Sequence, residues 1–284
     1  MHNYVLLAET GSDIPADLAA KYGVYTVPMH VAFGSETKDD GTFPIEEVYD
    51  YFSRTGNLTQ TSGCTVGDFE TVYDQIRKDH PDKHILHLAY SAVTTCSYQS
   101  AVIAAEGREN ITSLDTKHVS AGQTLVILML ARYLEAHPNA SLEQVTEKVE
   151  QLSKACRMGF FPGDLAYLRA GGRVSNAAYM GAKILSLNPL IELIDGKLIA
   201  TKKYRGKMAK IALELTREFP ETNHFSKDIL IFVYSKGLSE QIKAQTTAIA
   251  REQGFREIYW VQTGGVVTTH SGPGAFGVCG ISAE

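Results

Sequence analysis

Hydroxyl side chains gather in two short stretches that could hold an anion. The first stretch, residues 59–65, has the sequence Thr-Gln-Thr-Ser-Gly-Cys-Thr and ends where a helix is expected to begin. Side-chain O–H groups, backbone N–H groups and the positive end of a helix dipole all attract negative charge. The alternative interpretation is that Thr65 only caps the helix and that the preceding polar residues form a loop.

The second stretch, residues 90–97, has the sequence Tyr-Ser-Ala-Val-Thr-Thr-Cys-Ser, follows an expected strand and opens a helix. In doubly wound sheets, loops at the carboxyl ends of strands form the ligand site. Neither stretch contains the G-x-x-x-x-G-K-[ST] sequence of a phosphate-binding loop, which argues against nucleotide binding of that type. Together the two stretches predict an anion cradle made of neutral hydroxyl groups.

A third segment, residues 264–274, places His270 among small residues and several glycines. Glycines allow a ligand to approach the backbone closely. A single histidine can equally have a structural role, and at this point both interpretations stand.

One enzymatic alternative uses cysteine. Cys64 or Cys96 could pair with His270 as nucleophile and base, although cysteine is more often a small buried hydrophobic residue. The nine histidines show no spacing typical of metal ligands, and the sequence contains no G-x-S-x-G motif of a serine hydrolase. We therefore expect no metal and no cofactor.

Short apolar runs alternate with helical periods along the chain, and this pattern predicts an α/β fold. In the first half the order of elements predicts a mostly parallel sheet with helices on both faces. The expected strands are 4–8, 24–29, 84–89 and 111–115, and the expected helices are 65–77, 97–106, 121–136 and 142–158.

The second half is expected to form a mixed sheet with helices, because Asp195-Gly196 is typical of a hairpin turn. The expected strands are 190–194, 197–202, 229–234 and 258–262, and the expected helices are 164–168, 177–185 and 239–253. The pattern predicts two α/β domains, residues 1–157 and 158–284, with a ligand site between them.

Composition excludes several classes of protein. The net charge of −5 and the lack of a long Lys/Arg run argue against nucleic-acid binding. The amino terminus lacks the basic region of a signal peptide, and the apolar run 126–131 is too short to span a bilayer. Four cysteines stand far apart, as free thiols do in a reducing compartment. We expect a cytoplasmic protein with at most transient membrane contact.

Six short motifs, in this order, resemble those of the DegV family. Together they extend over essentially the whole chain. They are Ser12-Asp13-Ile14-Pro15, Thr61-Ser62, Ser97-Tyr98-Gln99-Ser100-Ala101, Asp164-Leu165 with Gly172-Arg173, Asn188-Pro189 with Asp195-Gly196, and the glycine-rich segment 265–274.

The resemblance implies a carrier of one long-chain fatty acid. Its carboxylate would be held by Thr61, Ser62, Thr95 and His270, and its acyl chain would lie in a tunnel between the domains. Further candidates for the lining of the pocket are Cys64, Cys96 and Gly272. Where the family has Gln-Pro, this chain has Gly63-Cys64, and where the family has Ser-Gly it has Thr95-Cys96. These departures change the lining that would select the acyl chain.

The resemblance also implies a partner, a separate fatty acid kinase that forms the acyl phosphate, so that catalysis lies outside this chain. The candidate docking residues are all basic, namely Arg169, Arg173, Lys202, Lys203 and Arg205; a solvated polar face is the alternative. Two other functions stay open. One is a Cys–His acyltransferase or hydrolase, and the other is an adaptor that binds another protein and uses the acid as a structural plug.

Overall fold

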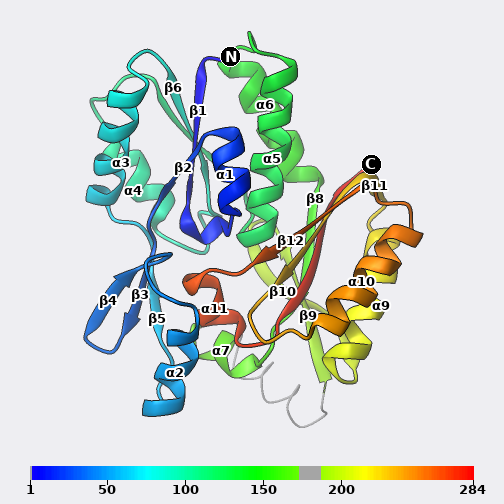
Figure 1. Cartoon of the computed structure of the whole chain (residues 1–284). Helices are drawn as coiled ribbons and strands as arrows, with labels where there is room; N and C mark the ends of the chain where they lie inside the picture. The colour runs from blue at the N-terminus through cyan, green and yellow to red at the C-terminus, as the bar shows by residue number, and fades with distance from the viewer. Residues whose placement is uncertain (1, 173–186) are drawn as a thin grey trace.

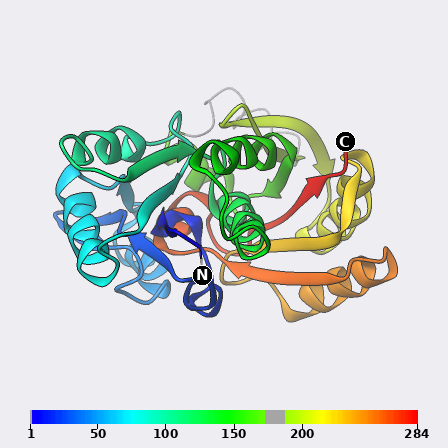
Figure 2. The ribbon, with the colours of Figure 1, turned by 90° about the horizontal axis from the view of Figure 1, so that it is seen from above.

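The computed structural model describes residues 2–172 and 187–284, and layers of helix and sheet alternate across it (Figures 1 and 2). The first sheet has the strand order β2-β1-β6-β7 and is parallel throughout. Its strands are β1 (Tyr4–Glu9), β2 (Val24–Val27), β6 (His84–Ala89) and β7 (Ile111–Asp115). The chain leaves β1 toward β2 on one side and later adds β6 on the other. The carboxyl ends of β1 and β6 therefore form the switch point where ligands bind in such sheets.

Helices cover both faces of this sheet, which is why every residue of β1 is buried. Alternate residues of β1 point to opposite faces: Leu7 packs with the core under α3 and α4, and Leu6 packs with the core under α5. The helices of this half are α1 (Ala16–Tyr22), α3 (Val66–Asp79), α4 (Ser97–Ala104), α5 (Ser120–Ala136) and α6 (Leu142–Ala155). The capping boxes at Thr65 and Ser141 form as their sequences predict.

The second sheet is mixed and has the strand order β10-β9-β8-β13-β11-β12. All neighbouring pairs are antiparallel except β11 and β12, which are parallel. Its strands are β8 (Cys156–Phe161), β9 (Leu187–Ile194), β10 (Lys197–Arg205), β11 (Phe225–Tyr234), β12 (Glu257–Gln262) and β13 (Phe276–Ser282). The predicted fold class, a parallel and a mixed sheet in an α/β protein, is confirmed, as is the hairpin at Asp195-Gly196.

Helix α5 is shared by the two sheets. Leu125 and its neighbours on α5 belong to one core that includes Leu88 of the first sheet and Ile231 of the second. Helices α9 (Met208–Thr222) and α10 (Glu240–Glu252) cover the outer face of the second sheet, away from the first (Figures 1 and 2). Since one helix supplies core residues to both sheets, packing on α5 fixes how the loops of one half meet those of the other.

A small antiparallel sheet of order β4-β3-β5 and one helix lie beside the first sheet. They comprise β3 (His30–Phe33), β4 (Glu36–Asp39), α2 (Glu46–Thr55) and β5 (Gln60–Ser62). The three strands were not predicted from the sequence, because they are short and largely polar, and helix α2 was not predicted either. Strand β5 lies inside the first hydroxyl-rich stretch, so that stretch is a strand followed by a loop.

Other predictions differ from the structure in extent. The helix expected over 142–158 ends at Ala155, because Cys156–Phe161 forms a central strand paired with β9 and β13. Strand β13, helix α9 and the short helix α11 (Gly265–Ser271) were not predicted, and the helix expected at 164–168 is α7 (Leu165–Ala170). The helix expected at 177–185 lies outside the described residues. The domain boundary between residues 157 and 158 stays a prediction.

Across residues 2–172 and 187–284, we find no helix with the length and apolar character needed to cross a membrane.

The shared core predicts that damage to α5 weakens the whole molecule. Leu125 is fully buried, and Leu125→Ala should lower the free energy of unfolding by about 2–5 kcal/mol. Chemical denaturation followed by circular dichroism measures this loss. The control is Leu142→Ala on α6, where the side chain is 37% exposed and a small loss is expected. Equal losses in the two variants would contradict the shared core.

Candidate ligand-binding site

A cavity of about 340 Å³ lies among the loops that follow β5 and β6, helix α11 and the second sheet. This volume is within the range of small-molecule pockets. Its walls combine aliphatic, aromatic and hydroxyl side chains. The described residues that line it are Met29, Thr61, Ser62, Gly63, Tyr90, Thr94, Thr95, Cys96, Val119, Ser120, Met158, Phe160, Leu168, Leu198, Val233, Tyr234, Thr263, Val266, Val267, His270, Ser271, Ala275 and Phe276.

The lining carries no formal charge apart from what His270 can acquire, since none of the described lining residues is Lys, Arg, Asp or Glu. An amphipathic ligand would therefore meet apolar surface for its tail and neutral hydrogen-bonding groups for its head. The described lining thus combines apolar surface with neutral hydrogen-bonding groups.

The four residues expected to hold a carboxylate, Thr61, Ser62, Thr95 and His270, all line this cavity. Thr61 Oγ1 and His270 Nε2 form a hydrogen bond of 2.8 Å, although the two residues are 209 positions apart. Of the three further lining candidates, Cys96 is on the wall, whereas Cys64 and Gly272 are not among the lining residues.

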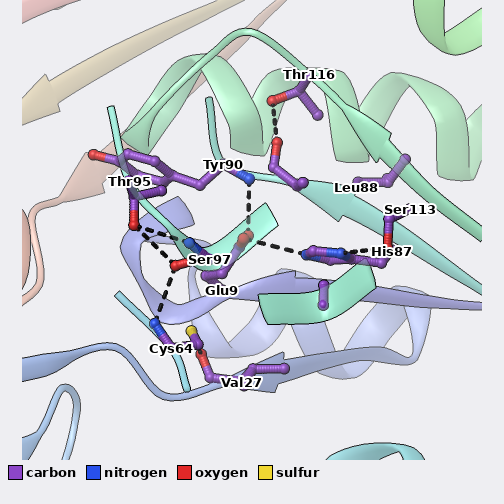
Figure 3. A network of polar contacts seen from close by, with 12 residues as sticks. Glu9, Val27, Cys64, His87, Leu88, Tyr90, Thr95, Ser97, Ser113 and Thr116 are labelled. Atoms are coloured by element: carbon purple, nitrogen blue, oxygen red, sulfur yellow. Dashed lines mark hydrogen bonds and ion pairs between the residues drawn. The ribbon is translucent and has the colours of Figure 1, made fainter. Parts of the chain in front are cut away.

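The two hydroxyl-rich stretches touch each other (Figure 3). Ser97 Oγ accepts a hydrogen bond of 3.0 Å from the Cys64 amide and lies 3.0 Å from Thr95 Oγ1. A Cβ on Gly63 would lie 2.4 Å from Thr95 Oγ1, so only glycine permits this approach. Gly63 therefore has a packing role at the point where Thr95 joins the site.

Helix α11, which carries His270, is held by side chains from the first half of the chain. Asp13 accepts a hydrogen bond of 2.7 Å from the Gly264 amide, and Asp40 accepts one of 2.7 Å from the Gly265 amide. Burial raises the pKa of both carboxyl groups. At the other end of α11, Thr59 Oγ1 and Thr269 Oγ1 are 2.9 Å apart. These contacts fix the position of His270 relative to the loops of the first sheet.

Beneath the second hydroxyl-rich loop lies a fully buried contact between a carboxylate and a histidine (Figure 3). Glu9 Oε1 at the end of β1 lies 3.2 Å from His87 Nε2 on β6, and His87 Nδ1 lies 3.1 Å from Ser113 Oγ. Glu9 Oε2 accepts hydrogen bonds of 2.9 Å from the Tyr90 amide and from Gln123 Nε2. Burial works against ionisation of Glu9, but His87 and the Tyr90 amide outweigh it, and the pKa of Glu9 is lowered. The pair anchors the start of the loop that carries Thr95.

The structure disfavours Cys64 as a nucleophile. The thiol is buried and 3.7 Å from the Val27 carbonyl oxygen, and burial raises the pKa of Cys64. Cys96 is exposed and lines the cavity. His270 is the base that would have to pair with either cysteine. Its Nε2 is hydrogen-bonded to the hydroxyl group of Thr61.

The candidate docking residues that the structure describes are on the surface. Arg169 is exposed in the last turn of α7, and Lys203 and Arg205 are exposed on β10. Lys202 forms a 2.7 Å ion pair with Glu218. Arg173 lies outside the described residues.

Several residues of the site were not predicted from the sequence. Ser120 and Thr263 line the cavity, and Asp13 and Asp40 support α11 from outside it. Ser120 comes shortly after β7, so the rule that sites form at the carboxyl ends of strands could have found it. Asp40 carries no such signal, because its role depends on a contact with residue 265.

In the part of the chain that the structure describes, no group of three or more His, Cys, Asp or Glu side chains could hold a metal ion.

Comparison with known proteins gives one consistent result. Residues 4–283 match the family model described as an uncharacterised protein of the DegV family. The fatty acid-binding protein of Thermotoga maritima is 25% identical over 278 residues, which cover 96% of this chain and 95% of that protein. The DegV protein of Bacillus subtilis is 22% identical over 280 residues, which cover 98% of this chain and 98% of that protein.

Solved structures agree with these matches. A fatty-acid-binding DegV family protein from Thermus thermophilus has a TM-score of 0.86 and 26% identity, with 99% of each chain covered. The fatty acid kinase B3 protein of Streptococcus pneumoniae, loaded with linoleic acid, has a TM-score of 0.84 and 16% identity, again with 99% of each chain covered. At this low identity, the second likeness establishes the fold alone.

The buried pair of Glu9 and His87 generates a prediction about pH. Because the pKa of Glu9 is lowered from 4.5 in the folded state, its charge stabilises the fold above pH 4.5, and this stabilisation is lost as pH falls through the folded pKa. Glu9→Gln should therefore lower the free energy of unfolding by about 3–5 kcal/mol at pH 7. Below pH 4.5 the difference from the unchanged protein should shrink.

Urea denaturation at a series of pH values measures this difference. Glu106→Gln, at an exposed position, is the control and should have little effect at any pH. A loss for Glu9→Gln that stays constant from pH 7 to acid would show that the charge of Glu9 is not what stabilises the fold.

Proposed function

The chain belongs to the DegV family, and we propose that it binds one long-chain fatty acid, with the carboxylate at Thr61, Ser62, Thr95 and His270. The observation that carries the proposal is the Thr61–His270 hydrogen bond on the wall of an otherwise uncharged, largely apolar cavity. The names of the Thermotoga maritima and Thermus thermophilus relatives as fatty-acid-binding proteins support it.

The head group of the ligand meets neutral donors. A carboxylate accepts charge-assisted hydrogen bonds from hydroxyl groups and from an imidazole N–H, and these are stronger than bonds between neutral groups. A bidentate arginine would hold the carboxylate more tightly but would also cover it. Hydroxyl groups leave its oxygens within reach of a phosphoryl donor, which favours a carrier that presents its ligand.

The acyl chain supplies most of the affinity in this proposal. At about 0.8 kcal/mol per buried methylene, roughly fifteen methylenes contribute on the order of 12 kcal/mol before ordering costs. Aliphatic and aromatic walls for such a chain come from both proposed domains: Met29 and Val119 from residues 1–157, and Phe160 and Phe276 from residues 158–284. This distribution supports a tunnel between the domains.

We propose further that a separate fatty acid kinase acts on the bound acid and that this chain performs no catalysis itself. The motifs shared with the DegV family support this role. The basic side chains Arg169, Lys203 and Arg205 are exposed and are the proposed docking residues, together with Arg173 outside the described residues. Positive charge suits a partner that carries acidic groups at its interface.

Variants of the head-group site test the binding proposal. Thr61→Val and His270→Ala should each weaken binding of a fluorescent fatty acid by about tenfold or more, since a hydrogen bond to a charged group is worth about 1.5–3 kcal/mol. Because the two side chains contact each other, the double variant should lose less than the product of the single losses.

Thr71→Val and His137→Ala, at exposed positions, are the matched controls and should bind normally. If the site variants bind as tightly as these controls, the carboxylate lies elsewhere.

The docking proposal has a separate test. Lys203→Glu with Arg205→Glu should abolish formation of acyl phosphate by the kinase while fatty-acid affinity stays unchanged, because both side chains are exposed. Charge reversal of exposed Lys78 on α3 is the control. A parallel loss of fatty-acid binding in the double variant would reject a role restricted to docking.

A further inference from the structure

Two cysteines lie close together behind the cavity. The Sγ atoms of Cys156 and Cys279 are 3.7 Å apart, and both side chains are buried. Cys156 pairs with Ile281 and Met158 pairs with Cys279 in the β8–β13 register, so the two cysteines are diagonal neighbours on one face of the second sheet. The first turn of α5 covers them: the Cys156 thiol lies 3.7 Å from the Gly122 carbonyl oxygen, and the Cys279 thiol 3.8 Å from that of Ala121.

A buried histidine completes this thiol cluster of Cys156, Cys279 and His118. His118 Nε2 lies 3.1 Å from the Ser153 carbonyl oxygen, which can only accept, so Nε2 carries a hydrogen. The His118 side chain also interacts with the Cys156 thiol through a side-chain hydrogen bond. A Cβ on Gly122 would lie 2.9 Å from Nδ1, so the glycine allows the ring to pack against α5.

The charges in the cluster favour a thiolate at Cys156. Burial opposes its ionisation, but the Cys279 thiol, His118 and Arg157 outweigh burial and lower the pKa of Cys156. Burial lowers the pKa of His118, but Cys156 outweighs that effect and raises it. The lowered pKa of Cys156 and the raised pKa of His118 both favour a protonated His118 beside a Cys156 thiolate. This arrangement makes a cysteine nucleophilic. The pKa of Cys279 is raised by burial and by its neighbour, so Cys279 stays a thiol.

The thiol cluster adjoins the cavity without lining it. Met158, the pairing partner of Cys279, is part of the cavity wall, as are Val119 and Ser120, which directly precede the α5 residues above the two sulfurs. A change in the thiol cluster would therefore reach the cavity through residues one or two positions away.

We propose that Cys156 and Cys279 form a reversible disulfide on exposure to a hydroperoxide, and that this bond reshapes the cavity assigned above to a fatty acid. The effect on the ligand rests on the proposed function; the disulfide itself does not.

Formation of the disulfide takes two steps. The Cys156 thiolate attacks the O–O bond, an S–O bond forms, and the leaving oxygen takes the proton from His118 to give an alcohol or water. The Cys279 thiol then attacks the sulfur of the Cys156 sulfenic acid, so that the S–S bond forms and water leaves with the thiol proton. The two thiols lose two electrons in total, and the hydroperoxide gains them.

The geometry also explains why the bond would be reversible. Diagonal neighbours on antiparallel strands have Cα atoms about 7–8 Å apart. An unstrained disulfide joins Cα atoms about 5.5–6 Å apart, with sulfurs about 2.05 Å apart. Forming the bond must therefore move β8 against β13, and Met158 with them, and strained disulfides are readily reduced. The moved wall should weaken binding of a long acyl chain by roughly tenfold, the equivalent of losing burial of about two methylenes.

The first experiment treats the reduced full-length chain with hydrogen peroxide or with linoleic acid hydroperoxide and maps its cysteines by mass spectrometry. We expect a loss of two hydrogens, a peptide that joins Cys156 to Cys279, and reversal by dithiothreitol. Cys96→Ala should still form the link, and Cys156→Ser and Cys279→Ser should not. His118→Gln should slow it. Formation of the disulfide with either oxidant supports the proposal. The oxidant that reacts faster shows whether hydrogen peroxide or a lipid hydroperoxide is the preferred reactant.

The protein is treated with oxidant until exposed Cys96 is oxidised, and is then unfolded and alkylated. The proposal is overturned if Cys156 and Cys279 are still alkylated under these conditions. This result needs only the unchanged protein, so it stands even if a serine variant fails to fold.

A second experiment compares fatty-acid affinity before and after oxidation of the Cys96→Ala variant. A reduced form that binds and an oxidised form that binds roughly tenfold more weakly support the inference. Equal affinity of the reduced and cross-linked forms would overturn the link to the cavity and leave the proposed function intact. If neither the reduced variant nor the reduced unchanged protein binds, it is the proposed function that fails.

Discussion

The hydrogen bond between Thr61 Oγ1 and His270 Nε2 requires two segments 209 positions apart to meet within 2.8 Å. Several other parts of the fold position these two residues. The small sheet presents Thr61, and α11 presents His270 because Asp13, Asp40 and Thr59 hold both of its ends. Such precision at a neutral site matters, because hydrogen bonds weaken steeply with poor alignment and no arginine is present among the described lining residues to compensate.

Helix α5 fixes the position of one sheet relative to the other. One continuous core joins both sheets through this helix, so the loops of the first sheet and the strands of the second keep a fixed relation. Buried polar groups of the first sheet also help to position the site. Glu9 and His87 are fully buried, and together they hold the Tyr90 amide at the start of the loop that carries Thr95 (Figure 3). Burying the Glu9 carboxylate costs desolvation, and here its contacts fix a loop at the site.

The sequence alone predicted the parts of the site that depend on residue type. Dense hydroxyl groups at 59–65 and 90–97 and a histidine among glycines at 264–274 were visible without a structure, and the family motifs connected them. Strand β6 was predicted to the residue, since an apolar run in a parallel sheet is a clear signal. Strand β7 was also predicted to the residue, although only Ile111 and Leu114 in it are apolar. The parts that depend on contacts between distant segments were not predicted. Strand β8 was taken for the end of a helix because its pairing with β9 and β13 decides its form. The support of α11 by Asp13 and Asp40 likewise has no local pattern.

Native mass spectrometry of the purified protein, followed by extraction and identification of whatever is bound, tests the central claim most directly. The account predicts one long-chain fatty acid for each chain, carried through purification or taken up from added palmitate or oleate. A protein that is empty and also fails to take up either acid would contradict it, and the cavity lined by Thr61 and His270 would then need a different ligand.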